Sequence, residues 1–265
     1  MSDRVRLKHD AKAVMREKAR PVFLTTILFL VISTVVDLLI QSVLGMDRWA
    51  NEVIDINMSF QQSLLNPAPT LLGDINGAYM GAMRGFVERL TPFDGVLGLV
   101  LSLAMSIVSF GYVIACLRIS RRQDTDVRTL FDGFAHAVKL IGLQIVIGVF
   151  VFLWTLLLVV PGIIAAFRYS MALWILADDP SKGILQCIGE SKEMMRGHKF
   201  GLFVLGLSFI GWALVGSIIS MFLSAFIGAM VPLFSVWLLP YMQLTTAGFY
   251  NRVSGADRAA DPPAL

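Results

Sequence analysis

Two ionisable residues, Asp37 and Arg168, lie inside long apolar stretches of the sequence. An ionisable side chain at the centre of a membrane helix costs on the order of 2.5 to 3.5 kcal/mol on the insertion scale, so it marks a structural partner or a function. The two could form a buried ion pair, or Arg168 could reach an interface or a backbone carbonyl near Pro161. The alternative is a contact between Arg168 and a substrate or anion. Gln144 and Gln243 complete this candidate intramembrane polar site, and both can also hydrogen-bond between helices.

These four residues must be positioned by membrane helices, because the composition excludes a water-soluble globule. Of 265 residues, 56% are hydrophobic and 15% are charged, whereas a soluble domain has roughly 25% charged residues. Six apolar runs approach the length of about 20 residues that spans a bilayer, at 21–44, 96–117, 140–160, 162–177 and two within 200–250. Turns are expected at Pro161-Gly162 and between Gly228 and Pro232. The prediction is an all-α polytopic membrane helix bundle of about six transmembrane helices arranged as three hairpins.

The distribution of basic residues predicts the orientation of these helices. Eighteen of the 22 Lys and Arg residues lie in residues 1–20, 118–139, 182–199 and 252–265. Residues 45–95 hold three Arg residues beside six acidic residues. By the positive-inside rule, both termini are cytoplasmic and the 45–95 segment lies outside. We therefore expect a multi-pass protein of the cytoplasmic membrane with cytoplasmic N- and C-termini.

Three spans are preceded by short stretches with helical apolar spacing, which predict interfacial amphipathic helices. Before the third span, Asp126 is the expected N-cap, and the apolar positions are Val127, Leu130, Phe131, Phe134 and Val138. Before the fifth span, Asp179 and Pro180 suit the helix start and Gly197 the stop. The face of that helix comprises Ile184, Ile188, Ser191 and Met195. The basic N-terminal stretch is a weaker version with Leu7, Ala11 and Val14.

The predicted domain organisation has three parts. Residues 1–20 form a cytoplasmic basic interfacial helix, residues 21–253 form the six-helix membrane domain, and residues 254–265 form a flexible cytoplasmic tail. The membrane domain includes an extracytoplasmic helical insertion at 46–95. Two helical stripes in this insertion flank the break at residues 66–69; they are Trp49, Val53, Ile56, Phe60, Leu64 and Ile75, Tyr79, Met83, Phe86, Leu90.

Two sets of small residues recur at every fourth position and predict helix-packing edges. The first is Gly73, Gly77, Gly81 and Gly85 in the insertion, and the second is Gly216, Ser220, Ser224 and Gly228 in the fifth span. Residues without a large side chain let another helix approach closely, as in the G-x-x-x-G motif. Packing within the same chain and association with a second copy are both open at this point.

Sequence signatures of catalysis and cofactor binding are absent from the chain. The sequence has no H-E-x-x-H motif, no G-x-S-x-G motif, no Walker glycine loop and no acidic metal cluster. Cys116 and Cys187 are too few for a disulfide framework or a zinc site. No basic stripe with interleaved aromatic residues indicates nucleic acid. We predict no catalytic residue, no metal and no cofactor; the expected partners are the lipid bilayer and either a second copy or another membrane protein.

Several motifs together resemble a known family. They are Thr129–Phe134, Val160–Ile164 with Arg168–Ser170, Glu190–His198, Ser208–Trp212, and Leu239–Tyr241 with Phe249–Tyr250. These motifs resemble the bacterial integral membrane family known as domain of unknown function 975, over the basic N-terminus and most of residues 118–252. They are also distantly similar to the membrane domain of glycerophosphodiester phosphodiesterases, but no phosphodiesterase domain is present, so that activity is not implied. The resemblance implies a polytopic protein of bacteria and supplies no functional residue.

Three functions remain open on the sequence alone. The leading hypothesis is a membrane protein without catalytic machinery that acts as an accessory, scaffold or envelope-maintenance component. The alternative is a small-solute or ion transporter or channel with a polar site near the membrane midplane. A second alternative is an enzyme acting on lipid headgroups, which would require Asp37 to cluster with acidic residues such as Asp47 or Asp55 around a metal.

Overall fold

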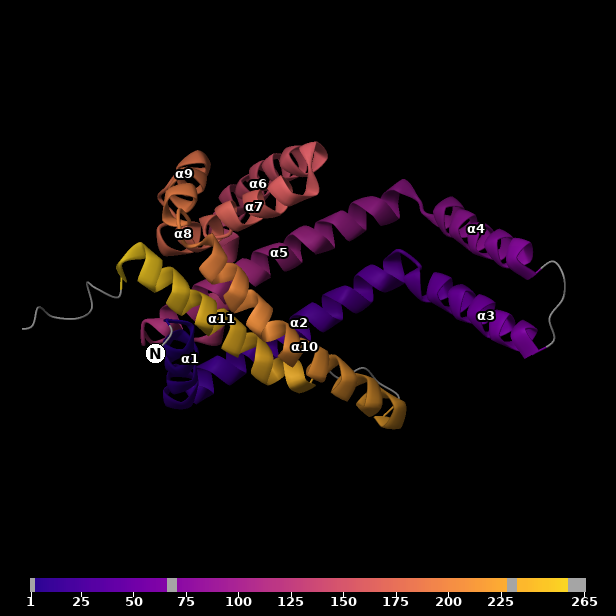
Figure 1. The fold of residues 1–265 in the computed structure, drawn as a ribbon, viewed down its shortest axis with the longest axis horizontal. Helices are drawn as coiled ribbons and strands as arrows, with labels where there is room; N and C mark the ends of the chain where they lie inside the picture. The colour runs from indigo at the N-terminus through magenta and orange to yellow at the C-terminus, as the bar shows by residue number, and fades with distance from the viewer. Residues whose placement is uncertain (1–2, 66–70, 228–232, 257–265) are drawn as a thin grey trace, which may run out of the picture. The chain divides into compact units, whose positions relative to one another are not determined.

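The computed structural model describes residues 3–65, 71–227 and 233–256, which form helices and no strand (Figure 1). In chain order the helices are α1 (Asp3–Glu17), α2 (Ala19–Val43), α3 (Met46–Leu65), α4 (Leu71–Arg89), α5 (Pro92–Ser120), the 3-10 helix η1 (Val127–His136), α6 (Ala137–Leu157), α7 (Val159–Tyr169), α8 (Ala172–Asp178), α9 (Ile184–Met194), α10 (Lys199–Ile227) and α11 (Leu233–Ser254). The predicted all-α fold class is confirmed. The expected turn at Gly228 to Pro232 and the end of the tail lie outside the described residues.

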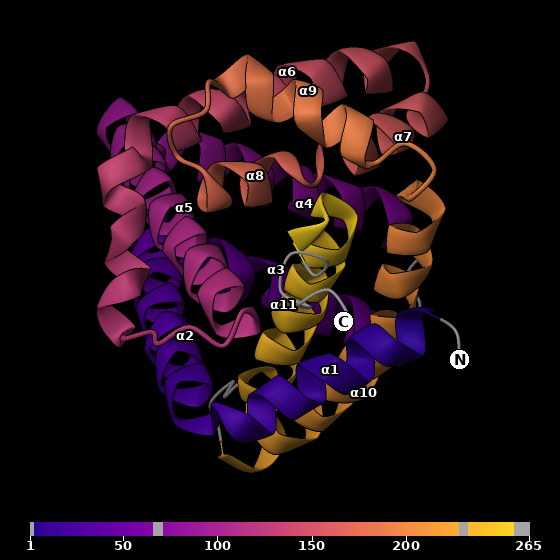
Figure 2. The same ribbon diagram turned by 90° about the vertical axis from the view of Figure 1, so that its left-hand side faces the viewer.

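Five segments of the described chain are long and apolar enough to cross a membrane. They are Ala19–Leu44, Pro92–Ser120, Val127–Leu157, Val159–Asp178 and Lys199–Phe222. The sixth predicted span corresponds to α11, which is not among them. Helix α11 instead packs against α1 and α10, and Figure 2 shows it enclosed by neighbouring helices. Because protein covers much of this helix, it tolerates Pro240, Gln243 and a buried Thr245 in its interior.

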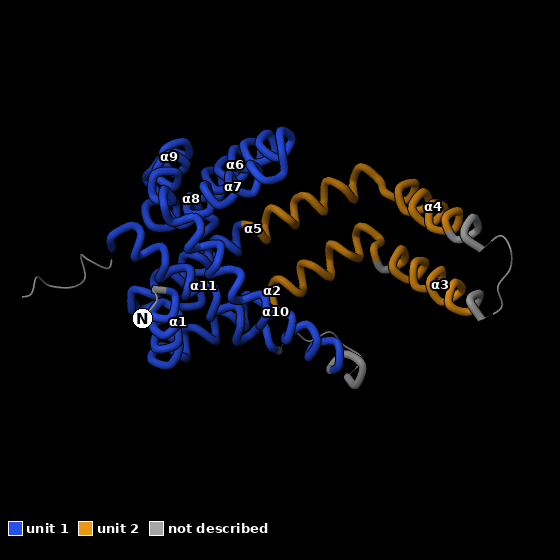
Figure 3. The backbone as a smooth tube through the Cα atoms, viewed as in Figure 1, with its two compact units in different colours: residues 1–30, 107–265 blue, residues 31–106 orange. Residues whose placement is uncertain are grey.

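The described chain divides into two compact units, and each is described by itself (Figure 3). Unit 1 comprises residues 1–30 and 107–265, and unit 2 comprises residues 31–106. Unit 1 holds one hydrophobic core to which α1, α2, α5 to α11 and η1 all contribute buried residues. The second half of α5 is the most enclosed part, since nearly every residue from Ile107 to Ile119 is buried.

The third and fourth predicted spans form a hairpin of α6 and α7, but the turn is not where we expected it. The chain reverses at Leu158, which has an extended backbone, and not at Pro161-Gly162. Pro161 instead lies in the first turn of α7, where its missing N–H removes no intrahelical hydrogen bond. A Cβ on Gly162 would lie 2.1 Å from the Thr155 hydroxyl, so this glycine allows α7 to approach α6 closely.

The stretch before α6 is helical and is capped as predicted, but it is a 3-10 helix. Asp126 accepts a hydrogen bond from the Val127 N–H at 2.7 Å, which confirms the N-cap. Three residues per turn place Leu130 and Gly133 on one side, where both are buried against α5. Phe131 and Phe134 remain half exposed and stack on each other, and Val138 is exposed. The predicted apolar face is therefore split between the core and the surface.

Helix α9 begins later than the sequence indicated. Its N-cap is Gly183 and its first residue is Ile184, whereas Asp179 accepts hydrogen bonds from the N–H and hydroxyl of Ser181 in the preceding turn. An aspartate that bonds its own backbone two residues on favours such a turn over a helix start. Gly197, with φ of +81°, lies beyond the end of the helix as predicted. Among the predicted face residues, Ile188, Ser191 and Met195 are buried.

Unit 2 contains the pair α3 and α4, whose predicted stripes face each other. Trp49 contacts Phe86, the Tyr79 hydroxyl donates to Asn57 at 2.6 Å, and Arg89 pairs with Glu52. The following helix, α5, starts with a reciprocal capping arrangement. The Thr91 N–H donates to Asp94, and the Asp94 N–H donates back to the Thr91 hydroxyl.

Candidate functional site

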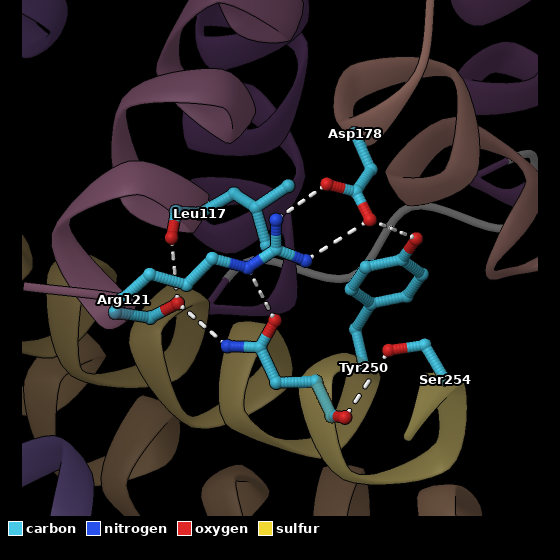
Figure 4. A network of polar contacts seen from close by, with 7 residues as sticks. Leu117, Arg121, Asp178, Tyr250 and Ser254 are labelled. Carbon is cyan, nitrogen blue, oxygen red and sulfur yellow. Dashed lines mark hydrogen bonds and ion pairs between the residues drawn. The ribbon is translucent and has the colours of Figure 1, made fainter. Parts of the chain in front are cut away.

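A charged network joins three helices of unit 1 at their C-terminal ends. Asp178, the last residue of α8, accepts hydrogen bonds from two guanidinium nitrogens of Arg121, just beyond α5, and from the Tyr250 hydroxyl of α11 at 2.9 Å (Figure 4). The Arg121 and Asp178 side chains are only 27% and 29% exposed. A bidentate arginine pair with a third donor on the same carboxylate is among the stronger polar contacts in proteins.

The network continues from Arg121 through the amide of Asn251. The Arg121 Nε donates to Asn251 Oδ1 at 3.0 Å, and Asn251 Nδ2 donates to the Ser120 hydroxyl at 3.0 Å. Ser120 in turn donates to the Leu117 carbonyl. Among the described residues no buried side-chain nitrogen or oxygen lacks a hydrogen-bond partner. We assign the network a structural role, because every group in it is satisfied by another protein group.

Sequence reasoning did not find this network. In the sequence, Arg121 is one of several basic flanking residues, Asp178 directly follows the apolar run 162–177, and Tyr250 ends the run 200–250. The one available signal is the position of Asp178 at the boundary of an apolar segment that ends in two consecutive acidic residues. Asp178 is 57 positions from Arg121 and 72 positions from Tyr250 in the sequence. Nothing in the sequence indicates that these three helix ends meet.

The structure places three members of the predicted intramembrane polar site in unit 1. Arg168 is half buried in α7, Gln144 is exposed on α6, and Gln243 is half buried on α11. Within the part of the chain that the structure describes, no hydrogen bond or ion pair joins the side chains of Arg168 and Gln243. The Arg168 carbonyl accepts a hydrogen bond from the Ser191 hydroxyl at 2.9 Å. Ser191 therefore ties α9 to the end of α7, which gives this buried hydroxyl a packing role.

Asp37, the fourth member, belongs to unit 2 and is exposed on α2. Because Asp37 and Arg168 belong to different units, their pairing stays a prediction. Among the described residues, no group of three or more His, Cys, Asp or Glu residues is placed to hold a metal ion. The Asp55 carbonyl accepts a hydrogen bond from the Ser59 hydroxyl within α3.

The two predicted packing edges have different environments. A Cβ added to Gly77 or Gly81 of α4 would meet nothing within 4 Å, and one added to Gly85 would meet only the side chain of Arg89. A Cβ added to Gly216 of α10 would lie 2.4 Å from the ring of Phe234 on α11. Gly73 lies within α4 and Ser220 and Ser224 within α10, whereas Gly228 is outside the described residues. The α10 edge thus packs inside the chain at Gly216, while the α4 edge is open.

A scan against protein-family models gives one assignment for the chain. The model described as Protein of unknown function (DUF975) matches residues 98–257, which is more than half of the sequence. The chain belongs to the DUF975 family. The DUF975 match leaves out residues 45–95, as expected, but it also leaves out the basic N-terminus, which we expected it to include. No curated protein matches the chain, and no solved structure matches it.

The motifs that carried the resemblance lie within the DUF975 match and have packing roles in the structure. Gly133 of the Thr129–Phe134 motif approaches the Ile107 carbonyl of α5 so closely that a Cβ would lie 2.4 Å from its oxygen. Gly162 approaches Thr155, Ser191 binds the Arg168 carbonyl, and Tyr250 binds Asp178. These residues of the DUF975 region therefore fix helix contacts in unit 1.

Proposed function

We propose that this protein is an accessory or scaffold component of the bacterial cytoplasmic membrane, with no reaction of its own, that binds a second copy or another membrane protein through α4. The observation that carries the proposal is the open glycine edge of α4, formed by Gly77 and Gly81. A small-residue edge allows close helix approach only if a partner helix lies against it, and among the described residues nothing lies within 4 Å of a Cβ built on Gly77 or Gly81.

The apolar surface beside this edge supports an interaction with a partner. Met80, Met83 and Val87 of α4 are 64%, 53% and 59% exposed, while Tyr79 and Phe86 are already engaged with α3. The charge distribution places this segment outside the membrane. Where a helix is surrounded by water or lipid headgroups, a group of neighbouring exposed apolar side chains typically marks an interaction site.

The association can be tested by crosslinking in membranes. A photoreactive benzoylphenylalanine replaces Ala78, an exposed α4 residue beside the edge, and the crosslinked products are purified through the full-length chain. We expect a dimer or one defined heteromeric band. The same experiment with Gly81→Leu added should lose that band, because the leucine fills the open edge at a position where the described residues leave room for a Cβ.

The matched control is Gly148→Leu on α6, where a Cβ also meets nothing within 4 Å. This variant should keep the crosslinked band, because it changes an open glycine far from α4 in the sequence. A crosslinking pull-down that returns neither a second copy nor a partner would overturn the proposal. A band that survives Gly81→Leu would show that the glycine edge is not the contact.

The proposed orientation needs a labelling position other than the native cysteines. Cys187 is fully buried, and burial raises the pKa of its thiol, so a membrane-impermeant maleimide cannot report its side. Leu185→Cys on α9, at a position 71% exposed, and Ala78→Cys on α4 are suitable instead. We expect labelling of intact cells at position 78 and, only after permeabilisation, at position 185. The reverse pattern contradicts the cytoplasmic placement of the termini.

Transport is a second candidate, favoured by the environment of Arg168. Arg168 is half buried within an apolar span, and among the described residues of unit 1 no carboxylate pairs with it. An intramembrane cation without such a partner suits contact with an anion. Proteoliposomes loaded with chloride or phosphate should release the anion faster than liposomes without the protein. The Arg168→Gln substitution should abolish this difference in release. Equal release with and without protein rejects this candidate for these anions.

A further inference from the structure

A cavity of about 750 Å³ lies in unit 1 between α1, the start of α10 and the end of α11. Arg4, His198 and Arg252 line it with basic side chains, and Leu7, Leu205 and Phe249 supply an apolar wall. Among the described residues that line it, none is acidic. The cavity is therefore basic on one part of its surface and apolar on another, a combination that suits an amphiphile carrying negative charge.

Arg4, one of the basic residues that line this cavity, differs from other basic residues of unit 1 in its pairing. Lys18, Arg118, Arg121 and Lys182 each form an ion pair with a carboxylate. Among the described residues, by contrast, Arg4 of α1 has none.

Basic side chains also crowd the face of α1 that packs on α10 and α11. Lys8 lies over the ring of Phe209 at 4.8 Å, and Lys12 lies over the ring of Tyr241 at 5.5 Å. Partial burial and the nearby charges of Lys12 and Arg4 lower the pKa of Lys8. A favourable field for an anion therefore surrounds the cavity.

The chemistry of the lining residues favours a phosphate group as the anion. Two guanidinium groups and an imidazole present N–H donors, and arginine matches the oxygen geometry of phosphate. Gly201, which also lines the cavity, lies in the first turn of the 29-residue helix α10. The unpaired N–H groups of such a turn add to the attraction for an anion.

The position of the cavity favours a lipid as the source of that phosphate. It lies at Gly201 and Leu205, near the start of the apolar span Lys199–Phe222. A phosphodiester bound by the basic residues would thus lie at the depth where a helix leaves the hydrocarbon for the headgroups.

We propose that this cavity is a binding site for the phosphate headgroup of an anionic phospholipid, held by Arg4, His198 and Arg252 against the apolar wall of Leu7, Leu205 and Phe249. The site ties α1, an amphipathic basic helix, to the lipid surface through one bound molecule. It does not depend on the α4 edge, so the two proposals stand or fall separately.

Native mass spectrometry of the full-length protein in a neutral detergent tests the site, with phosphatidylglycerol as the probe. Neutral micelles carry no surface potential, so bound lipid reports contacts and not general attraction. We expect one retained phosphatidylglycerol per chain. The double variant Arg4→Gln with Arg252→Gln should weaken binding by roughly 25-fold, since one basic group near a headgroup changes affinity about fivefold.

Two further variants separate the site from nonspecific effects. Arg6→Gln with Arg16→Gln removes the same charge from α1 at exposed positions outside the cavity lining and should change binding by less than about threefold. Gly201→Glu places a carboxylate in the cavity, where a Cβ meets only the Phe249 ring at 3.9 Å. It should fold normally, because an acidic residue suits a helix start, and should lose the lipid.

The outcomes discriminate between the sources of the phosphate. Retention of phosphatidylglycerol but not of phosphatidylcholine, with loss in both cavity variants, supports the lipid site. Equal binding losses in the cavity and control doubles overturn it, as does retained lipid in Gly201→Glu. A third outcome would overturn the lipid source in favour of a soluble phosphate compound. In that outcome millimolar glycerol 3-phosphate displaces the lipid, and the cavity variants bind phosphatidylglycerol as the unchanged protein does.

Discussion

Four tightly packed glycines of unit 1 have environments opposite to those of two α4 glycines in unit 2. In unit 1, Gly111, Gly133, Gly162 and Gly216 each lie where a Cβ would come within 2.5 Å of another atom, so each marks a helix contact inside the chain. In unit 2, Gly77 and Gly81 meet nothing. Gly216 and the two α4 glycines nevertheless belong to the same kind of pattern in the sequence, with small residues at every fourth position. Small-residue spacing therefore indicates that a helix can be approached closely, but not whether the approaching helix belongs to the same chain.

The largest effect should come from Gly111→Ala, which tests the packed side of this comparison. The new Cβ would lie 1.9 Å from the carbonyl oxygen of Leu130, a backbone atom that cannot rotate away. We expect a loss of about 3 kcal/mol or more in the free energy of unfolding, at the upper end of overpacking effects. Thermal unfolding of the purified protein in detergent measures it. Gly77→Ala is the matched change in unit 2 and should be neutral or slightly stabilising; equal losses would erase the difference between the units.

A smaller effect is expected for Asp178→Asn, which tests whether unit 1 depends on its polar network as well as on close packing. The change keeps the side-chain shape but leaves the Arg121 guanidinium without its carboxylate. Because both side chains are more than a quarter exposed, solvent screens part of the loss, and we expect about 1 to 2 kcal/mol. A double-mutant cycle with Arg121→Gln isolates the coupling. Additive effects would show that the pair contributes nothing of its own.

Gly216→Ala should cost less than Gly111→Ala, because the conflicting atom belongs to a side chain. Its Cβ would lie 2.4 Å from a ring atom of Phe234, which can move. We expect a loss of about 1 kcal/mol. Adding Phe234→Ala should make the Gly216 substitution neutral, measured as the difference between Phe234→Ala with and without it. A persistent cost in the Phe234→Ala background would mean that another contact restricts this position.

The smallest effects are expected for surface ion pairs, which occur in both units. Asp124→Asn removes the carboxylate that pairs with Lys18, and Glu52→Gln removes the one that pairs with Arg89. The hydrogen bond from Lys18 lowers the pKa of Asp124, so any stabilisation is present at neutral pH and is lost as the carboxylate protonates in acid. Asp124 is fully exposed, so we expect no resolvable change in melting temperature at pH 7. A clear drop in melting temperature for only one of the two variants would show that the units differ in their dependence on charge as well as in their packing.

Much of the fold follows from patterns that are local in sequence. The apolar runs, the Asp126 cap, the Gly197 stop and the facing stripes of α3 and α4 each depend on residues within a few turns of one another. The start of α9 and the turn at Leu158 were missed for a related reason. Asp179-Pro180 and Pro161-Gly162 are strong signals of a break, but they leave open whether a helix starts or a turn forms at that residue.

The site was harder to predict because it depends on contacts between distant helices. Hydropathy singled out Asp37 and Arg168, since charges in apolar runs are conspicuous. The network of Arg121, Asp178 and Tyr250 and the cavity at Arg4, His198 and Arg252 consist of residues at helix ends, where charge is ordinary. Only the arrangement of α1, α5, α8, α10 and α11 brings them together.

The enclosed position of α11 has a consequence for how the protein is made. This helix is synthesised after every helix that it contacts, and its surroundings are protein more than lipid. The faces of α1 and α10 that it covers thus stay unfilled until translation reaches residue 254. Completion of α11 is the step that covers these faces, and a membrane protease that recognises uncovered helix faces would distinguish chains made before this step from chains made after it.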